Sequence, residues 1–178
     1  AFRLDPATIK RWRWVADGAR KYFSGEVRGF EHVPEQGPFL IVGNHSGGLL
    51  MPDAYVFLSA WWTERFGQPL YSLGHDLLFT IPYFGDLARA AGVLPGRMRY
   101  AEAALERGAP VLVYPGGDSE VFRPSSQRNR IVFDGRYGFI RLALRQQVPI
   151  VPVVGYGAND VNYFVTRGEG LAKMLGLN

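Results

Sequence analysis

Cysteine is absent from this chain of 178 residues, so disulfides, thiolate metal sites and a cysteine nucleophile are all excluded. Histidine is scarce as well, since the chain holds only His32, His45 and His75, which lie far apart in the sequence. Their spacing is not that of zinc ligands, and carboxylates would be needed to complete such a site. We therefore expect a protein without a metal ion or another cofactor of its own.

Long apolar runs are also missing. No stretch reaches the roughly 18 consecutive apolar residues that a membrane-spanning helix needs, and residues 1–21 are charged throughout, unlike a signal peptide.

Lysine is rare, with 3 residues against 17 arginines, and the formal net charge is +4. Arginine binds flat anions such as phosphate and carboxylate. No dense basic stripe or recognition motif indicates nucleic acid as the partner.

The composition that remains is typical of one globular domain, with 47% apolar and 20% charged residues. Apolar residues recur near one face over residues 6–23, which predicts an amphipathic helix that either packs on its own domain or lies on a membrane surface. Further along, short apolar runs alternate with helical patterns. This alternation predicts an α/β fold, a single domain with a largely parallel central sheet flanked by helices. Strands are expected at residues 25–29, 39–42, 70–73, 93–94, 111–114 and 148–154, and helices at 54–66, 99–107 and 137–146.

A polar, glycine-rich loop, Gly43–Gly48, directly follows the expected strand 39–42. Open α/β sheets bind ligands at the carboxyl ends of their strands, and imidazole is the side-chain group most often used as a general base at neutral pH. Asp53, the nearest downstream acid, would hold that imidazole in one tautomer, or it caps the next helix, or both. Ser46 lacks the Gly-x-Ser-x-Gly context of a nucleophile.

A second loop begins at Pro115, after the expected strand 111–114. Gly116 and Gly117 allow a ligand to approach the backbone, whose N–H groups could bind an anionic head group or an oxyanion. Taken alone, such a Pro-Gly-Gly sequence is most often a simple turn. Several arginines follow that either grip the phosphates of a donor such as coenzyme A or are simply solvated: Arg123, Arg128, Arg130 and Arg136.

Three segments in order resemble the glycerolipid and lysophospholipid acyltransferase superfamily: Asn-His at 44–45, Pro-Gly-Gly-x-x-Glu at 115–120 and Val-Pro-Ile-Val-Pro-Val at 148–153. The segment 138–160 looks particularly like the monoacylglycerol/diacylglycerol acyltransferase branch, and the resemblance covers about residues 25–165. It implies a lipid-metabolic or phospholipid-biosynthetic enzyme. Such an enzyme transfers a fatty acyl group from a coenzyme A or carrier-protein thioester to a lipid hydroxyl. It also implies a peripheral site on the cytoplasmic face of a membrane.

The resemblance assigns the base to His45 and its partner to Asp53. The family motif leaves four residues between histidine and aspartate, whereas seven intervene here and Leu50 stands at the usual position. Either the loop bulges to bring Asp53 back, or His45 is oriented differently. Substrate binding is expected from Asn44, Ser46, Gly47, Arg97, Gly116, Gly117, Glu120 and Arg123.

Two of these residues carry particular roles in the resemblance. Glu120 would sit near the acceptor or stabilise the transition state, and Arg97 loosely matches another acceptor-binding block. Two other functions use the same residues: a thioester or lipid-ester hydrolase in which His45 activates water, and a lipid-binding domain without catalysis. Because family chains continue well past the position of Asp160, we expect this chain to lack the C-terminal part of the family domain.

Overall fold

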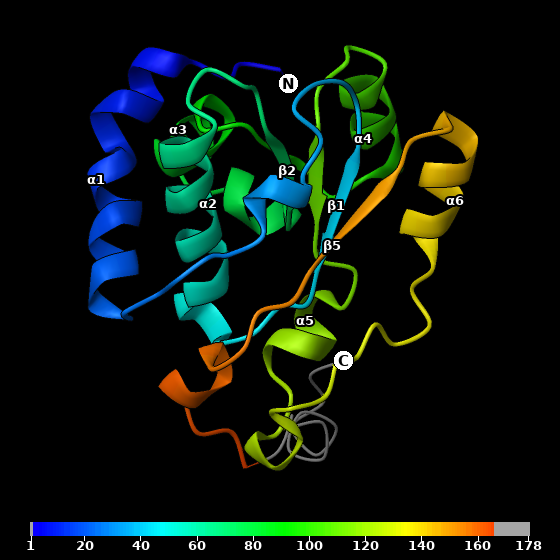
Figure 1. The fold of residues 1–178 in the computed structure, drawn as a ribbon. Coiled ribbons are helices and arrows are strands. Elements are labelled where there is room, and N and C mark those ends of the chain that lie inside the picture. The colour runs from blue at the N-terminus through cyan, green and yellow to red at the C-terminus, as the bar shows by residue number, and fades with distance from the viewer. Residues whose placement is uncertain (1, 166–178) are drawn as a thin grey trace.

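A parallel sheet of five strands runs through the middle of the domain (Figure 1). The computed structural model describes residues 2–165, and the end of the expected domain, residues 166–178, lies outside them. The strands are β1 (Leu40–Gly43), β2 (Tyr71–Gly74), β3 (Val93–Pro95), β4 (Val111–Val113) and β5 (Ile150–Val153). The α-helices are α1 (Pro6–Tyr22), α2 (Pro52–Glu64), α3 (Phe84–Ala90), α4 (Met98–Leu105), α5 (Gly117–Val121) and α6 (Gly138–Gln146). The strand order is β3-β2-β4-β1-β5, so the predicted α/β fold is confirmed.

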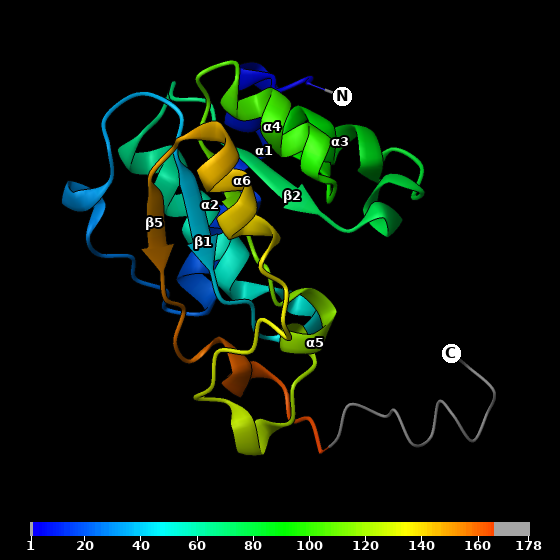
Figure 2. The ribbon, with the colours of Figure 1, turned by 90° about the vertical axis from the view of Figure 1, so that its right-hand side faces the viewer.

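Helices cover both faces of the sheet, and the side chains of β1 alternate between two cores. Leu40 and Val42 belong to the core beneath α4 and α6, whereas Ile41 and the preceding Phe39 pack with Trp61 of α2. Successive side chains of a strand point to opposite faces. A strand that is covered on both faces therefore needs the unbroken apolar run that the sequence shows. Figures 1 and 2 show α2 on one side of the sheet and α4 and α6 on the other.

Helix α1 forms an outer layer against α2 (Figures 1 and 2). Asp5 caps its first turn by accepting hydrogen bonds from the N–H groups of Ala7 and Thr8. Ile9 and Ala16 are buried, and the expected helix over residues 6–23 is therefore present and packed on the domain. Within residues 2–165, no helix combines the length and the apolar character that crossing a bilayer requires.

The strand expected at residues 25–29 is wrong. This segment crosses α2, where none of the strands within residues 2–165 lies alongside it, and a Cβ atom on Gly25 would overlap the side chain of Val56. The carbonyl oxygen of Gly25 accepts a hydrogen bond from Arg20 Nε, 3.1 Å away, instead of from a strand. An alternating pattern of residue types is not sufficient for a strand when no partner lies alongside.

Candidate active site

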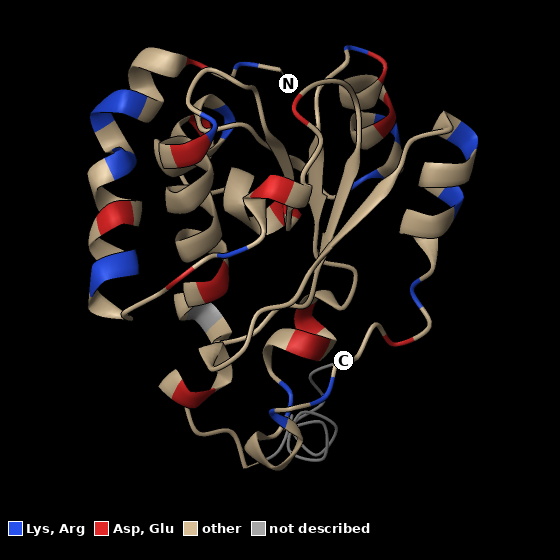
Figure 3. Cartoon of the chain, viewed as in Figure 1, with Lys and Arg blue, Asp and Glu red and all other residues tan. Residues whose placement is uncertain are grey.

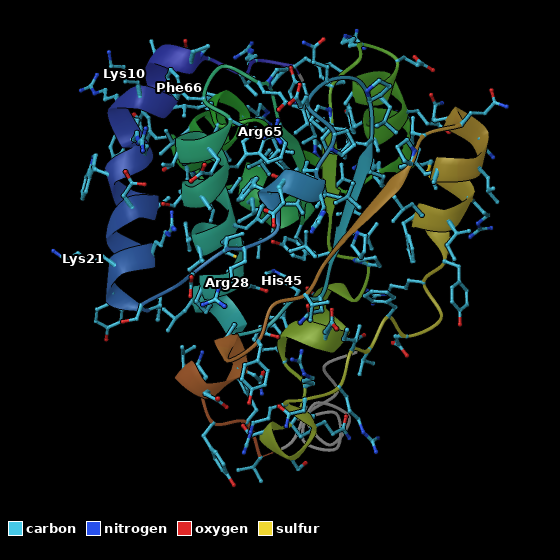
Figure 4. All side chains as sticks on the ribbon, in the orientation of Figure 1. Lys10, Lys21, Arg28, His45, Arg65 and Phe66 are labelled. Carbon is cyan, nitrogen blue, oxygen red and sulfur yellow. The ribbon has the colours of Figure 1, made fainter. Side chains whose placement is uncertain are left out.

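The carboxyl ends of β4, β1 and β5 lie next to one another because these strands are parallel and adjacent. The three loops that leave them therefore meet at one end of the sheet, as expected for a ligand site. His45 is the second residue after β1 and lies at this end, above α5 in Figure 4. Its side chain is 12% exposed.

Asp53 lies beside His45. The Nδ1 atom of His45 is 2.8 Å from Oδ2 of Asp53, and the aspartate side chain is only 5% exposed. A carboxylate accepts at this distance, so Nδ1 carries the hydrogen of this contact, and in the neutral imidazole the lone pair is then on Nε2. The same carboxylate accepts the N–H groups of Ser46, at 2.8 Å, and of Ala54, at 2.9 Å. Asp53 thus contacts the imidazole and also bonds an amide in the first turn of α2.

The loop accommodates the seven intervening residues by folding back on itself. Gly47 and Gly48 have φ angles of +89° and +61°, a short 3₁₀ turn follows, and Met51 has φ +42° before Pro52 begins α2. A Cβ atom on Gly47 would overlap Cδ of Pro52 and lie 2.8 Å from the carbonyl oxygen of Ala158. The first explanation of the spacing, a bulged loop that returns Asp53 to the histidine, is the one the structure shows.

Tyr114, which the sequence analysis did not single out, stacks on the imidazole. The ring centroids of His45 and Tyr114 are 4.5 Å apart, with an angle of 17° between the rings. Burial, with a smaller contribution from Asp53, raises the pKa of Tyr114 well above its usual value of 10.0, so the phenol stays neutral. Its position directly between β4 and the Pro-Gly-Gly turn was the signal that could have identified it.

Glu120 and Arg123 are buried beneath the His45 loop, 0% and 2% exposed. Glu120 Oε2 accepts the N–H of His45 at 2.8 Å, and its Oε1 accepts the N–H of Val132 at 2.9 Å. Arg123 donates from Nη1 to the carbonyl oxygen of His45 at 2.8 Å and from Nη2 to Oγ of Ser46 at 2.6 Å. Burial raises the pKa of Glu120 and lowers that of Arg123.

Asn44 and Gly47 are held by the segment after β5. The side-chain amide of Asn44 donates to the carbonyl oxygen of Gly155 at 2.9 Å and accepts the N–H of Gly155 at 2.7 Å. The amide of Asn162 donates to the carbonyl oxygen of Gly47 at 2.7 Å. Both residues lie at the site, and the contacts that the structure gives them fasten the His45 loop to the end of β5.

The two glycines after β4 also lie beside this network. The N–H of Gly117 donates to the carbonyl oxygen of Tyr114 at 3.2 Å, which leaves the N–H of Gly116 as the free amide of the pair among residues 2–165. A Cβ atom on Gly116 would overlap the carboxylate of Glu120. Glycine at this position therefore allows the close approach that Glu120 needs.

Arg97 is not brought to His45. It follows β3, which is three strands from β1 in the sheet, a separation of about 14 Å at the usual strand spacing. Its guanidinium pairs with Asp76 at 2.8 Å, and both side chains are more than half exposed. Within residues 2–165, no group of three or more histidine or carboxylate side chains could hold a metal ion.

The fold and the site together define a parallel α/β domain with a histidine–aspartate pair at the carboxyl ends of its strands. The sequence model of the Acyltransferase family matches residues 24–155, and the chain belongs to this family. No solved structure matches the chain.

Three curated proteins are similar to the chain over most of its length. An uncharacterized protein of Mycobacterium tuberculosis is 30% identical over 158 residues, which are 89% of this chain and 44% of the relative. A human DGAT1/2-independent enzyme synthesizing storage lipids is 31% identical over 138 residues, 77% of this chain and 41% of the relative. The chloroplastic phytyl ester synthase 1 of Arabidopsis thaliana is 27% identical over 156 residues, 85% of this chain and 22% of the relative. The chain thus spans less than half the length of these proteins.

Proposed function

We propose that this chain is an O-acyltransferase domain that moves a fatty acyl group from a coenzyme A or carrier-protein thioester to the hydroxyl of a lipid alcohol. The observation that carries the proposal is the 2.8 Å contact between His45 Nδ1 and Asp53 Oδ2. It is the arrangement in which a carboxylate fixes one histidine tautomer and leaves the other ring nitrogen as a base. Membership of the Acyltransferase family supports the reaction class.

In this mechanism the acceptor hydroxyl lies against Nε2 of His45. The imidazole takes the hydroxyl proton as the oxygen attacks the thioester carbonyl, and Asp53 stabilises the imidazolium that forms. The tetrahedral intermediate then collapses, the C–S bond breaks, and the proton passes from His45 to the leaving thiolate. The oxyanion of the tetrahedral intermediate needs nearby hydrogen-bond donors. We assign this role to the N–H of Gly116.

The acceptors to test first are neutral lipid alcohols. The names of two relatives refer to storage lipids and to phytyl esters, and both kinds of product are esters of such alcohols. Lysophospholipids belong in the same panel because the superfamily resemblance includes them. The donor is the acyl thioester itself, and His45 with Asp53 needs no further cofactor for this chemistry.

We also propose that the domain works at the surface of a membrane, on its cytoplasmic face. Helix α1 exposes Trp14 and Tyr22 beside Lys10, Arg11 and Lys21. Figure 3 shows the basic residues spaced along this helix, and Figure 4 shows Lys10 and Lys21 extending away from the domain. Aromatic and basic side chains on one surface helix suit the interface of an anionic membrane.

The reaction class is tested by incubating the purified chain with labelled acyl-coenzyme A or acyl-carrier protein, with and without each alcohol of the panel. The proposal predicts a labelled ester that forms only when the alcohol is present. Free fatty acid released at the same rate with and without alcohol would instead identify a hydrolase. Binding of the lipids with neither product would identify a lipid-binding domain without catalysis.

A further inference from the structure

The terminal N–H groups of the Arg123 guanidinium all donate hydrogen bonds to other groups of the protein. Nη1 donates to the carbonyl oxygens of His45 at 2.8 Å and of Glu120 at 2.9 Å. Nη2 donates to Oγ of Ser46 at 2.6 Å and to the carbonyl oxygen of Arg128 at 3.1 Å. Each of these nitrogens carries two hydrogens, so four hydrogens meet four acceptors. Within residues 2–165, the Nε–H is the one donor of Arg123 without a partner, and it is buried. No terminal donor remains for the phosphate of a substrate.

Glu120 binds the main-chain N–H of His45, the residue whose carbonyl oxygen Arg123 binds. Its Oε2 accepts the main-chain N–H of His45, while Arg123 binds the main-chain carbonyl oxygen of His45. Both side chains come from α5 and the turn after it, so one short segment holds both polar backbone groups of the histidine. Asp53, on a different helix, holds the imidazole.

The placement of these charges is costly, which points away from a role in stability alone. Removing a guanidinium and a carboxylate from water is unfavourable, and buried charged groups are often replaced by apolar side chains without loss of stability. A buried arginine with an unpartnered Nε adds to that cost. The hydrogen bonds instead fix the geometry of the loop that bears the histidine.

We propose that Arg123, together with Glu120, is a positioning residue that clamps the backbone of His45 so that its imidazole stays between Asp53 and Tyr114. This assignment differs from the expectation that Arg123 grips donor phosphates. It deepens the proposed function and rests on it for the kinetic part of its test. Small errors in the placement of a base lower the rate of the chemical step more than the binding of substrate.

The test compares Arg123→Lys with Arg65→Lys. Lysine keeps the positive charge near Glu120, but its single nitrogen cannot reach four acceptors spread around a planar guanidinium. Arg65 is the matched control because its Nη2 also donates to two carbonyl oxygens, those of Phe30 and Val33. Arg65 follows the carboxyl end of α2 (Figure 4), whereas Asp53 lies in the first turn of that helix.

Two readouts are needed: kcat and KM for acyl transfer, and the ¹⁵N spectrum of the His45 imidazole, which reports its tautomer. For Arg123→Lys we expect kcat to fall about 10- to 100-fold with KM changed less than about twofold. The Nδ1–H form should give way to a mixture of tautomers. Arg65→Lys should change neither readout. Ser46→Ala, which removes one acceptor only, should shift both readouts in the same direction by a smaller amount, and it decides the question if Arg123→Lys does not fold.

An unchanged kcat and an unchanged imidazole spectrum in Arg123→Lys would overturn the proposal. So would a raised KM with the wild-type kcat, because that result would place Arg123 in contact with the substrate. The spectrum separates this proposal from the proposed function. If the wild-type chain transfers no acyl group, the tautomer of His45 in the variants still shows whether Arg123 positions it.

Discussion

At the scale of single residues, four buried or partly buried side chains determine how His45 is presented. Asp53 holds its imidazole, Tyr114 covers one face of the ring, and Glu120 and Arg123 hold its backbone. The carboxylates have different surroundings. Asp53 meets the imidazole, whereas the Glu120 side chain accepts two main-chain N–H groups and has a raised pKa because it is desolvated.

The raised pKa of Glu120 predicts how its contribution to stability changes with pH. The folded protein binds the carboxyl proton of Glu120 more tightly than the unfolded chain does, in which the pKa of this glutamate is near 4.5. The stabilisation from the protonated form is therefore complete below the unfolded pKa and is lost as pH rises through the folded pKa. Glutamine has no such proton. Urea unfolding of wild type and Glu120→Gln should give a free-energy difference, wild type minus variant, that falls as pH rises above about 4.5. A free-energy difference that grows with pH would contradict the raised pKa of Glu120.

At the scale of elements, the link between β1 and α2 returns Asp53 to His45, and Gly47 makes that link possible. Alanine at φ +89° is strained, and its Cβ would also overlap Pro52. Gly37→Ala is the matched control, because its φ is +92° and nothing lies within 4 Å of the added Cβ. We expect Gly37→Ala to lose about 1–2 kcal/mol of unfolding free energy and keep its activity. Gly47→Ala should lose roughly 1–3 kcal/mol more, together with most acyl transfer. Thermal unfolding and the transfer assay measure both, and equal losses in the two variants would refute the role of the Gly47 contact.

Much of the arrangement of elements was predictable from the sequence. The strands β1 to β5 begin within two residues of the expected runs. The strands β1 and β4 are buried along their whole length, and a strand covered on both faces must be continuously apolar. The helix α5 was not predicted, since its five residues carry acidic and small side chains without an apolar face. The contact between His45 and Asp53 was proposed, but the course of the loop depends on backbone angles at Gly47, Gly48 and Met51 that no local pattern specifies.

Local sequence patterns also fail to specify which site residues are buried. Arg123 and Arg128 lie three and eight positions beyond Glu120 and look alike in the sequence, yet Arg123 is buried and Arg128 is exposed. Their difference arises from the fold, which places Arg123 beneath the His45 loop. Sequence patterns identify which residue types lie near a strand end, but not whether a charged side chain faces a ligand or the backbone of its neighbour.

At the scale of the whole molecule, the basic and aromatic outer surface of α1 predicts binding to anionic vesicles. The formal net charge of +4 adds a long-range attraction that salt weakens. The chain should co-sediment with anionic liposomes at low salt and largely detach at about 0.5 M salt. Replacing Trp14 and Tyr22 by serine should reduce binding, while Tyr137→Ser, beside α6 on the opposite face of the sheet, should not. Absence of the wild-type chain from the low-salt pellet would contradict the membrane proposal.

The central claim is that His45, oriented by Asp53, is the base of an acyl-transfer reaction. The most direct test is kcat for ester formation by wild type, His45→Ala and Asp53→Asn, each confirmed as folded by circular dichroism. A general base of this kind contributes about 10²- to 10⁴-fold to the rate, so His45→Ala should lose that factor. Asp53→Asn should fall in the same direction because the imidazole loses its preferred tautomer. Wild-type turnover in His45→Ala would contradict the claim.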